Sequence, residues 1–268
     1  MNLVKGEFFP SIADKILYYY DNLMCDPNDI KNGDIVYCDT HYILKYKDIL
    51  NTKNDLTIIT HNSDHCLYDG EENNYNGVNV DELTCYSKWF GQNSYSKKVI
   101  PLPIGFENTR WEGSYGPKNE WLNQSRKKNT YPSSLVYLNC NKSTNCIDRS
   151  DCYDKLSKMS FVVIDEPNLS YPEYLNKIKD HMFVISPRGN GLDCHRTWEV
   201  LMMRRIPILK REGQLEELYK NFPVLFIDSW DDMNNIDFEK IFKESSFDNQ
   251  EYLYFNFWKK MIYETLKK

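Results

Sequence analysis

The stretch 183–209, FVISPRGNGLDCHRTWEVLMMRRIPIL, constrains the fold of this chain more than any other part. A β-branched apolar run leads into a polar loop with two glycines, and an amphipathic helix and a second apolar run follow. Gly189 and Gly191 predict a sharp turn or a close approach of the backbone to another group. Asp193 is placed to cap the helix, whose free N–H groups then face the loop. The stretch therefore predicts a strand–loop–helix–strand unit with an anion site at the start of the helix.

The rest of the second half of the chain repeats this alternation. Apolar runs of strand length occur at residues 135–138, 161–164, 182–185, 206–209 and 224–227. Helical patterns lie between them, near residues 149–158, 171–180, 193–204 and 213–220. Continuous apolar strands that alternate with helices predict a parallel α/β sheet covered on both faces.

The first half gives a mixed pattern. It predicts strands at 34–39, 56–60 and 98–103, the last short or at a sheet edge because it holds two prolines. It also predicts helices at 11–22 and 41–50, a loop at 70–79 and a charged helix or connector at 114–132. At 268 residues the chain is long enough for two domains. We expect them at 1–130 and 131–248. The last segment, 249–268, is expected to return toward the first domain, and its aromatic-rich helix over 249–266 is expected to pack across both halves.

Composition excludes several classes of function. The net charge of -6 argues against a general nucleic-acid or anionic-membrane surface, so we expect no nucleic-acid partner. No run of about 18 apolar residues occurs, and the N-terminus lacks the apolar core of a signal peptide, so we expect no membrane span. Eight scattered cysteines without a Cys-x-x-Cys pair predict free, mostly buried thiols in a reducing, cytoplasmic location.

Three polar side chains around the glycine loop could bind a nucleotide. Arg188 lies between strand and helix, where an arginine can hold a diphosphate through two parallel hydrogen bonds. On the helix, Arg196 could reach phosphate and Glu199 a ribose diol, and His195 shares their side. Two other interpretations stay open from the residues alone: an ordinary strand–helix turn, and a structural ion pair between Arg196 and Glu199.

His61 and Asp64 are the best candidates for a general base, because they follow directly after the strand at 56–60. Asn62 and its neighbours are also good turn or helix-cap residues, which is the structural alternative. Glu107 is a weaker candidate for the same role.

Several familiar motifs are absent. The dinucleotide fingerprint is incomplete, because Cys194 stands where its third glycine belongs. Walker A, Gly-x-Ser-x-Gly and His-Glu-x-x-His do not occur. No Asp-x-Asp pair occurs either, so a site that neutralises phosphate with arginine and a helix dipole is favoured over one built on metal-binding carboxylates.

The pattern SPRGNGLDCHRTWE at 186–199, followed by Ile206-Pro-Ile, resembles the nucleotide-sugar motif of the exostosin-like glycosyltransferases, including short soluble versions from bacteria and large DNA viruses. Residues 60–64, 89–93 and 104–108 fit the same family. Together these segments span residues 60–209, about half the chain. The chain departs from the family before Ile206, where Met203, Arg204 and Arg205 replace the usual small residue and glycine.

The resemblance implies a GT-B architecture, in which two Rossmann-like domains face each other across a cleft. It places the diphosphate at Arg188 and Arg196 and the ribose at Glu199, with Asp64 or His61 as the base. The donor side would comprise Arg188, Gly189, Asn190, Gly191, Asp193, His195, Arg196 and Glu199. The acceptor side would comprise Asn62, Gln92, Asn93, Glu107 and Asn108.

The leading hypothesis is thus an inverting, metal-independent glycosyltransferase that moves a sugar from a UDP-sugar, with UDP-xylose among the candidates, to a hydroxyl of a glycan acceptor. No further cofactor is expected. Two alternatives stay open: a transferase that uses a GDP-sugar, including a fucosyl donor, and a catalytically silent module that only binds nucleotide or carbohydrate.

Overall fold

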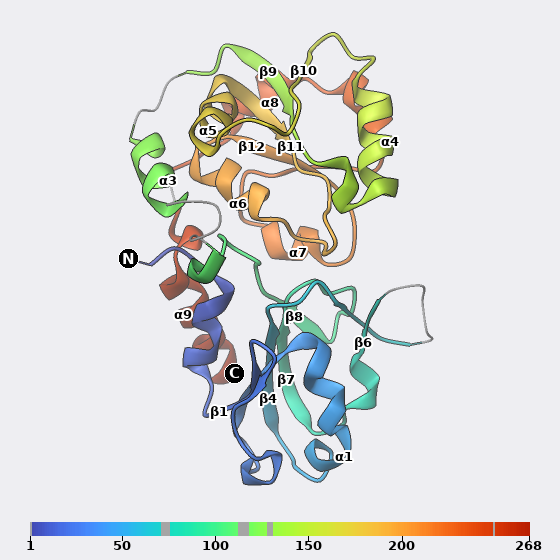
Figure 1. Ribbon diagram of the computed structural model, residues 1–268, viewed down its shortest axis with the longest axis vertical. Coiled ribbons are helices and arrows are strands. Elements are labelled where there is room, and N and C mark those ends of the chain that lie inside the picture. The colour runs from blue at the N-terminus through green and yellow to red at the C-terminus, as the bar shows by residue number, and fades with distance from the viewer. Residues whose placement is uncertain (1, 71–75, 112–117, 128–130, 249) are drawn as a thin grey trace.

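The computed structural model describes residues 2–70, 76–111, 118–127, 131–248 and 250–268. It is a mixed α/β fold with two lobes, each built on a mainly parallel sheet with helices against it. Figure 1 shows the two lobes one above the other, with the N-terminal lobe below. Every strand of the N-terminal sheet precedes residue 130, and every strand of the C-terminal sheet follows it.

The six-stranded sheet of the N-terminal lobe has the order β2-β1-β3-β4-β7-β8, and only the β1–β2 pair is antiparallel. Its strands are β1 (Lys15–Tyr19), β2 (Asn22–Leu23), β3 (Ile35–Asp39), β4 (Leu56–His61), β7 (Tyr86–Gly91) and β8 (Val99–Pro101). Strands β5 (Cys66–Tyr68) and β6 (Gly77–Asn79) pair separately. The helices of this lobe are the 3₁₀ helices η1 (Gly6–Ile12), η2 (Pro27–Asp29), η3 (Thr40–Tyr46) and η4 (Val80–Glu82), and α1 (Lys47–Leu50). As two prolines predicted, β8 lies at the sheet edge.

The C-terminal lobe has a fully parallel sheet with the order β10-β9-β11-β12-β13. Its strands are β9 (Ser134–Leu138), β10 (Val162–Ile164), β11 (His181–Ile185), β12 (Ile206–Lys210) and β13 (Leu225–Ile227). Its helices are η5 (Lys142–Thr144), α4 (Cys146–Leu156), α5 (Tyr171–Asp180), α6 (His195–Met202), α7 (Leu215–Tyr219), η6 (Trp230–Asn235) and α8 (Phe238–Glu244). All five predicted strands and all four predicted helices of this half are confirmed. A further helix, α3 (Lys118–Arg126), packs against α5 and α6.

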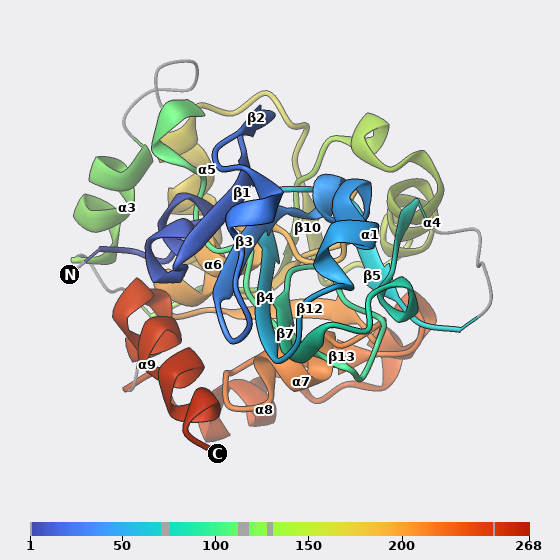
Figure 2. The same cartoon turned by 90° about the horizontal axis from the view of Figure 1, so that it is seen from below.

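Both sheets are covered on both faces, which the continuous apolar runs predicted for the C-terminal sheet. All five residues of β11 are buried, because helix α4 packs on one side of the C-terminal sheet and α5 and α6 on the other. In the N-terminal lobe, Val36 and Ile58 face a core with residues of η3 and α1, while Tyr37 and Ile59 face η1. Figure 2 shows α1 on one side of β3 and β4 and the last helix on the other.

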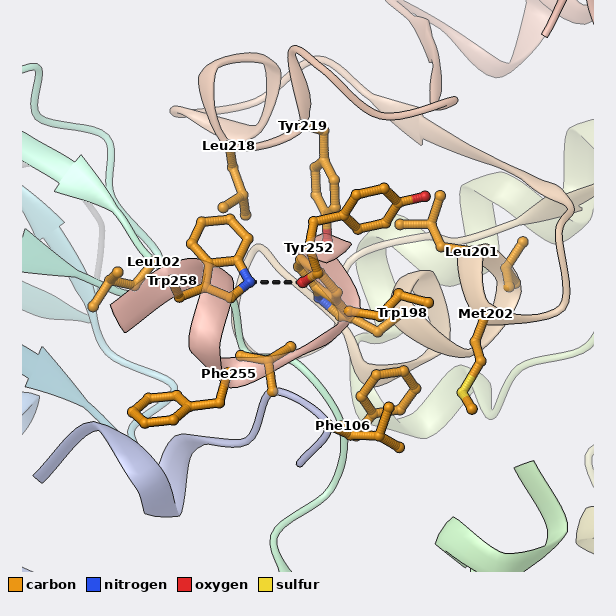
Figure 3. Packing of buried hydrophobic residues seen from close by; sticks show 14 of the residues in the cluster. Leu102, Phe106, Trp198, Leu201, Met202, Leu218, Tyr219, Tyr252, Phe255 and Trp258 are labelled. Carbon is orange, nitrogen blue, oxygen red and sulfur yellow. Dashed lines mark hydrogen bonds between the residues drawn. The ribbon is translucent and has the colours of Figure 1, made fainter. Parts of the chain in front are cut away.

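The last helix, α9 (Phe255–Leu266), follows a 3₁₀ turn, η7 (Glu251–Leu253), and joins the two lobes. Phe255 packs edge-on against Phe9 of the N-terminal lobe, with ring centroids 5.5 Å apart. Trp258 packs against Trp198 of the C-terminal lobe at 6.0 Å and donates a hydrogen bond to the Tyr252 carbonyl (Figure 3). One hydrophobic core therefore runs through both lobes, and the expectation that this segment packs across both halves is confirmed.

The helix predicted over 11–22 is wrong. The chain forms η1, which holds Pro10, and then β1, which pairs in parallel with β3. Tyr20 and Asp21 both have positive φ (48° and 62°) and make a two-residue hairpin turn into β2. Long-range pairing of Ile16 and Tyr18 with β3 outweighs their weak helical pattern.

Two further predictions need correction. The loop expected at 70–79 contains strand β6, which pairs with β5, while residues 71–75 lie outside the described residues. The helix expected over 249–266 begins only at Phe255, because Tyr254 is extended and forms a β-bridge with Leu3. Residue 249 lies outside the described residues. Of the predicted segment 114–132, the described part forms α3, and residues 114–117 and 128–130 lie outside the description.

No helix in the described part of the chain is long and apolar enough to cross a membrane. The prediction of free thiols is confirmed, since all eight cysteines are unpaired and five of them are buried.

Candidate active site

The strand order of the C-terminal lobe creates a crevice between β9 and β11. From β9 the chain crosses to β10 on one side, while β11, β12 and β13 follow one another on the opposite side. Helix α4, which leaves β9, and helix α6, which leaves β11, accordingly cover opposite faces of the sheet. In parallel sheets such a switch point opens beyond the carboxyl ends of the two strands and is where ligands bind.

Two cavities adjoin one another at this edge. The larger, the glycine-loop cavity, has a volume of about 690 Å³ and lies between residues 139–149, 167–174 and 189–199. The smaller, the N-terminal cavity, measures about 270 Å³ and lies beyond the carboxyl ends of β1, β4 and β7. Asp64, Ile104 and His195 line both cavities. A ligand in one cavity would therefore meet a ligand in the other beside these three residues.

Gly191 lets the loop after β11 approach the N-terminal lobe. A Cβ atom at this position would lie 2.6 Å from Nδ2 of Asn93. Asn93, which has a left-handed φ of 58°, accepts hydrogen bonds from the backbone N–H groups of Leu192 and Asp193 through Oδ1, at 3.0 and 3.2 Å. The close approach expected at Gly191 is thus confirmed, but its partner is Asn93. Asn93 clamps the two lobes together and does not line the N-terminal cavity.

Asp193 has a structural role in place of the predicted helix cap. Helix α6 starts after Cys194, and no side chain caps it. The buried Asp193 carboxylate instead accepts hydrogen bonds from the backbone N–H groups of Ile104 and Cys194, both at 2.8 Å. It also accepts from Nε1 of Trp198 and from the Tyr219 hydroxyl. Because Ile104 belongs to the N-terminal half, this carboxylate ties the start of α6 to the other lobe.

Arg188 points away from the glycine-loop cavity. Its guanidinium pairs with Glu212, donates to the Tyr95 hydroxyl at 3.1 Å and lies 3.7 Å from Asp148. It contributes to a separate small hollow behind the loop. The geometry therefore does not support the prediction that Arg188 contacts a ligand of the glycine loop, because nearby carboxylates hold its side chain and neutralise its charge.

Two other arginines supply positive charge to the glycine-loop cavity. Arg149, which is only 8% exposed, donates from Nε to the Arg188 carbonyl at 3.0 Å and from Nη1 to the Asn141 carbonyl at 2.7 Å. Arg196 lies over the ring of Tyr174, 5.3 Å from its centroid, and its Nη1 is buried with no hydrogen-bond partner among the described residues.

Neither Arg149 nor Arg196 forms an ion pair with a carboxylate in the described part of the chain. Buried charges in proteins are normally paired, because burial without a partner costs several kcal/mol. Two such cations on the walls of one cavity, beside the N-terminus of α6, form a site suited to an anion with about two negative charges.

Glu199 lines the same cavity and is held in place by Tyr171. The Tyr171 hydroxyl donates to Oε1 of Glu199 at 2.8 Å. Burial, together with the neighbouring Glu199 charge, raises the pKa of the Tyr171 phenol far above its usual value, so this hydroxyl stays a donor. No direct ion pair joins Arg196 and Glu199 among the described residues, although the two opposite charges are close enough to attract each other. The carboxylate is thus oriented toward the cavity as an acceptor for ligand hydroxyls.

Amide side chains line the N-terminal cavity. Asn62, with a left-handed φ of 53°, donates to the Tyr37 hydroxyl and accepts from Asn108. Gln92 is only 2% exposed, and its Oε1 is buried without a hydrogen-bond partner in the described structure. An orphaned buried acceptor facing a cavity is suited to a ligand hydroxyl. Of the five predicted acceptor-side residues, these three line the cavity.

Glu107 does not belong to this cavity. Its carboxylate pairs with Lys118 of α3 at 2.9 Å. Its proposed role on the acceptor side, or as a base, has no support in the geometry, because the ammonium group holds it beside α3.

One side of the N-terminal cavity has aromatic rings and a cation. The Arg110 guanidinium lies 3.7 Å from the ring centroid of Tyr20 and 4.4 Å from that of Trp111, and Trp111 is 45% exposed. Tyr20 reaches this position from the strained hairpin turn after β1. Exposed rings of this kind can pack against the apolar face of a sugar.

His61 is unsuited to act as a base. Nε2 of the ring lies 2.8 Å from the Pro103 carbonyl, which can only accept, and Nδ1 accepts the backbone N–H of Asn62 at 2.8 Å. The ring also stacks on Phe9. Burial lowers the pKa of His61 to about 4, so the ring is neutral at pH 7 and both nitrogens are occupied. The geometry therefore argues against a catalytic His61, and the residue instead forms part of the wall of the N-terminal cavity.

The buried neutral ring predicts a specific pH dependence. Because the pKa is about 4 in the folded state and near 6.5 when unfolded, acid favours the unfolded chain across that range. The stability advantage of the wild type over His61→Gln should be largest at pH 7 and shrink by about 2 kcal/mol at pH 5. Urea unfolding of both proteins at several pH values measures this difference. An unchanged difference would show that the ring is not held neutral.

Asp64 and His195 remain where the two cavities meet. Asp64 is exposed, and its Oδ2 accepts a hydrogen bond at 3.2 Å from the side chain of Asn190 in the glycine loop. Nδ1 of His195 lies 2.7 Å from the Gly105 carbonyl. Both residues are thus within the predicted site, and each connects one lobe to the other.

The sequence interpretation missed Arg149, Tyr171 and Tyr174 on the donor side, and Tyr20, Arg110 and Trp111 on the acceptor side. One available signal was overlooked. The strand at 135–138 ends in Asn139 and Asn141, and polar residues at a strand end were the feature that identified Asp64. The aromatic residues had no local signal.

No protein-family model matches the chain, and a search of curated proteins found no match. In the described residues, no group of three or more His, Cys, Asp and Glu side chains is arranged to hold a metal ion. The interpretation of the site therefore depends on its geometry and on the motif resemblance.

Proposed function

We propose that the protein is a glycosyltransferase of GT-B architecture that transfers a sugar from a nucleotide-sugar donor to a hydroxyl of a glycan acceptor. The observation that carries this proposal is a pair of arginines without an ion pair among the described residues, the buried Arg149 and the half-buried Arg196 with its buried Nη1, in a cavity at the switch point of a parallel sheet. A diphosphate carries about two negative charges, which would neutralise the two arginines.

The donor fits the glycine-loop cavity in one orientation. With the diphosphate between the arginines and the start of α6, Glu199 can accept hydrogen bonds from the ribose hydroxyls. The sugar then extends toward Asp64 and His195, where the two cavities join. UDP is our preferred nucleotide because of the resemblance to exostosin-like enzymes.

The acceptor belongs in the N-terminal cavity. Gln92 offers a buried carbonyl oxygen to a hydroxyl, and Trp111 offers an exposed ring to the apolar side of a sugar. The acceptor hydroxyl would attack the anomeric carbon from the face opposite the diphosphate, which inverts its configuration. The bond from the anomeric carbon to the phosphate oxygen breaks, and the arginines stabilise the charge on the leaving diphosphate. The proton passes to Asp64 or His195.

The experiment is a nucleotide panel. We expect UDP to bind with a Kd below about 1 mM, more tightly than GDP, CMP or NAD, in isothermal calorimetry. Tighter binding of GDP would instead favour a GDP-sugar transferase. Nucleotide binding without transfer or hydrolysis of any donor would favour the silent module, and binding of none of these nucleotides contradicts the proposal.

A further inference from the structure

The proton acceptor must lie where the two cavities meet. An acceptor hydroxyl in the N-terminal cavity and an anomeric carbon in the glycine-loop cavity can approach each other only there. Of the three residues that line both cavities, Ile104 cannot titrate, which leaves Asp64 and His195. His61 is excluded because both its ring nitrogens are occupied.

The hydrogen bond to Gly105 fixes the tautomer of His195. A backbone carbonyl can only accept, so the contact of 2.7 Å requires the proton on Nδ1. The neutral ring therefore carries its lone pair on Nε2, which can accept a proton. The same carbonyl also stabilises the ring once Nε2 has taken up a proton.

The orienting carbonyl is itself held firmly. Gly105 has a φ of +68°, and a Cβ atom there would lie 2.3 Å from the Val4 carbonyl oxygen. That oxygen accepts the backbone N–H of Phe106 at 2.8 Å, and Lys5 forms a bridge to Gly105. The N-terminal segment thus presents the Gly105 carbonyl to His195, which begins helix α6 of the other lobe.

Asp64 is less well placed to accept the proton. Its carboxylate is exposed and already accepts from Asn190, so it holds the glycine loop toward the N-terminal lobe. The charged side chains that line the two cavities with His195 are Asp64, Glu199, Arg110, Lys118, Arg149 and Arg196, while Asp193 accepts from four donors.

We propose that His195 is the general base of the reaction and that Asp64 is a positioning residue. This inference rests on the proposed function. Nε2 takes the proton of the acceptor hydroxyl as its oxygen bonds to the anomeric carbon, and the electron pair of the broken bond leaves with the diphosphate. The imidazolium then returns the proton to solvent, so the enzyme is regenerated.

The test compares His195→Gln with Asp64→Asn. Loss of a general base should lower kcat by about 100-fold or more in His195→Gln, with the Kd for UDP within about threefold of wild type. Asp64→Asn should lower kcat by less than about tenfold. Added imidazole should restore part of the activity of a His195→Gly variant, which a merely structural histidine would not allow.

The pH profile gives an independent readout. The pH dependence of kcat should differ between wild type and His195→Gln, whereas Asp64→Asn should keep the wild-type profile. Transfer by the wild type with an unchanged kcat and pH profile in His195→Gln would overturn this inference while leaving the proposed function intact. Absence of transfer by the wild type would count against the function itself.

Discussion

Replacing Arg196 by alanine is expected to weaken UDP binding by about 10- to 100-fold, because a charge-assisted hydrogen bond to phosphate contributes about 1.5–3 kcal/mol. The buried Nη1 of this guanidinium has no partner in the described structure, and under the proposed function it donates to a phosphate oxygen of the ligand. The free energy of unfolding should stay within about 1 kcal/mol of wild type, since removal of a buried, unpaired charge relieves a cost. Calorimetry and urea unfolding measure the two quantities.

Arg188→Lys is the matched control for this prediction. It changes an arginine of the same motif, but one that pairs with Glu212 outside the cavity, and lysine keeps the positive charge there. Its affinity for UDP should stay within about twofold of wild type. Equal loss of affinity in both variants would show that the loop as a whole, and not the Arg196 charge, controls binding. A large loss of stability in Arg196→Ala alone would make Arg196 a structural residue.

Gly191→Ala is expected to destabilise the protein by roughly 2–4 kcal/mol and to abolish donor binding. The added Cβ would lie 2.6 Å from Nδ2 of Asn93 and 2.9 Å from its Oδ1. Asn93 could then no longer accept from the backbone of Leu192 and Asp193, and the contact between the lobes would open. The midpoint of urea unfolding and the UDP titration report both effects.

Gly189→Ala, two residues earlier in the same loop, is the matched control. Its Cβ would lie 3.4 Å from Nη2 of Arg149 and 3.7 Å from the next atoms, which are ordinary contacts for a flexible side chain. Neither glycine has a positive φ, so backbone strain is the same in both variants. We expect a change in stability of less than about 1 kcal/mol for Gly189→Ala. Similar losses in both variants would contradict the role given to the Asn93 clamp.

The sequence predicted most of the C-terminal lobe because its signals are local. The runs around β11 and β12 are continuously apolar, and the helix between them buries one face at the expected spacing. The first lobe was harder to predict. Residues 15–19 carry a weak helical pattern but form β1, since pairing with β3 is a long-range effect that no local pattern records. In the same way, the β-bridge between Leu3 and Tyr254 keeps Tyr254 extended, so α9 begins later in the chain than the local pattern predicts.

The candidate site could be located from the sequence but not assigned in detail. The loop at 186–199 and the strand end at His61 do meet, because both lie at the carboxyl ends of parallel strands. The roles of individual side chains depend on strand order and on contacts between lobes. Arg188 was predicted to line the glycine-loop cavity, but its ion pair with Glu212 holds it outside. Arg149 lines the cavity instead, because it follows strand β9, which pairs with β11.

The central claim, that the glycine-loop cavity holds the diphosphate of a sugar donor, is tested most directly by release of the nucleoside diphosphate. Wild type, Arg196→Ala and Arg188→Lys would be incubated with UDP- and GDP-sugars, with and without oligosaccharide acceptors, and the freed UDP or GDP measured. We predict release from at least one donor by wild type and by Arg188→Lys, and at least a tenfold lower rate for Arg196→Ala at subsaturating donor. Equal release by wild type and Arg196→Ala, or no release from any donor, would contradict the claim.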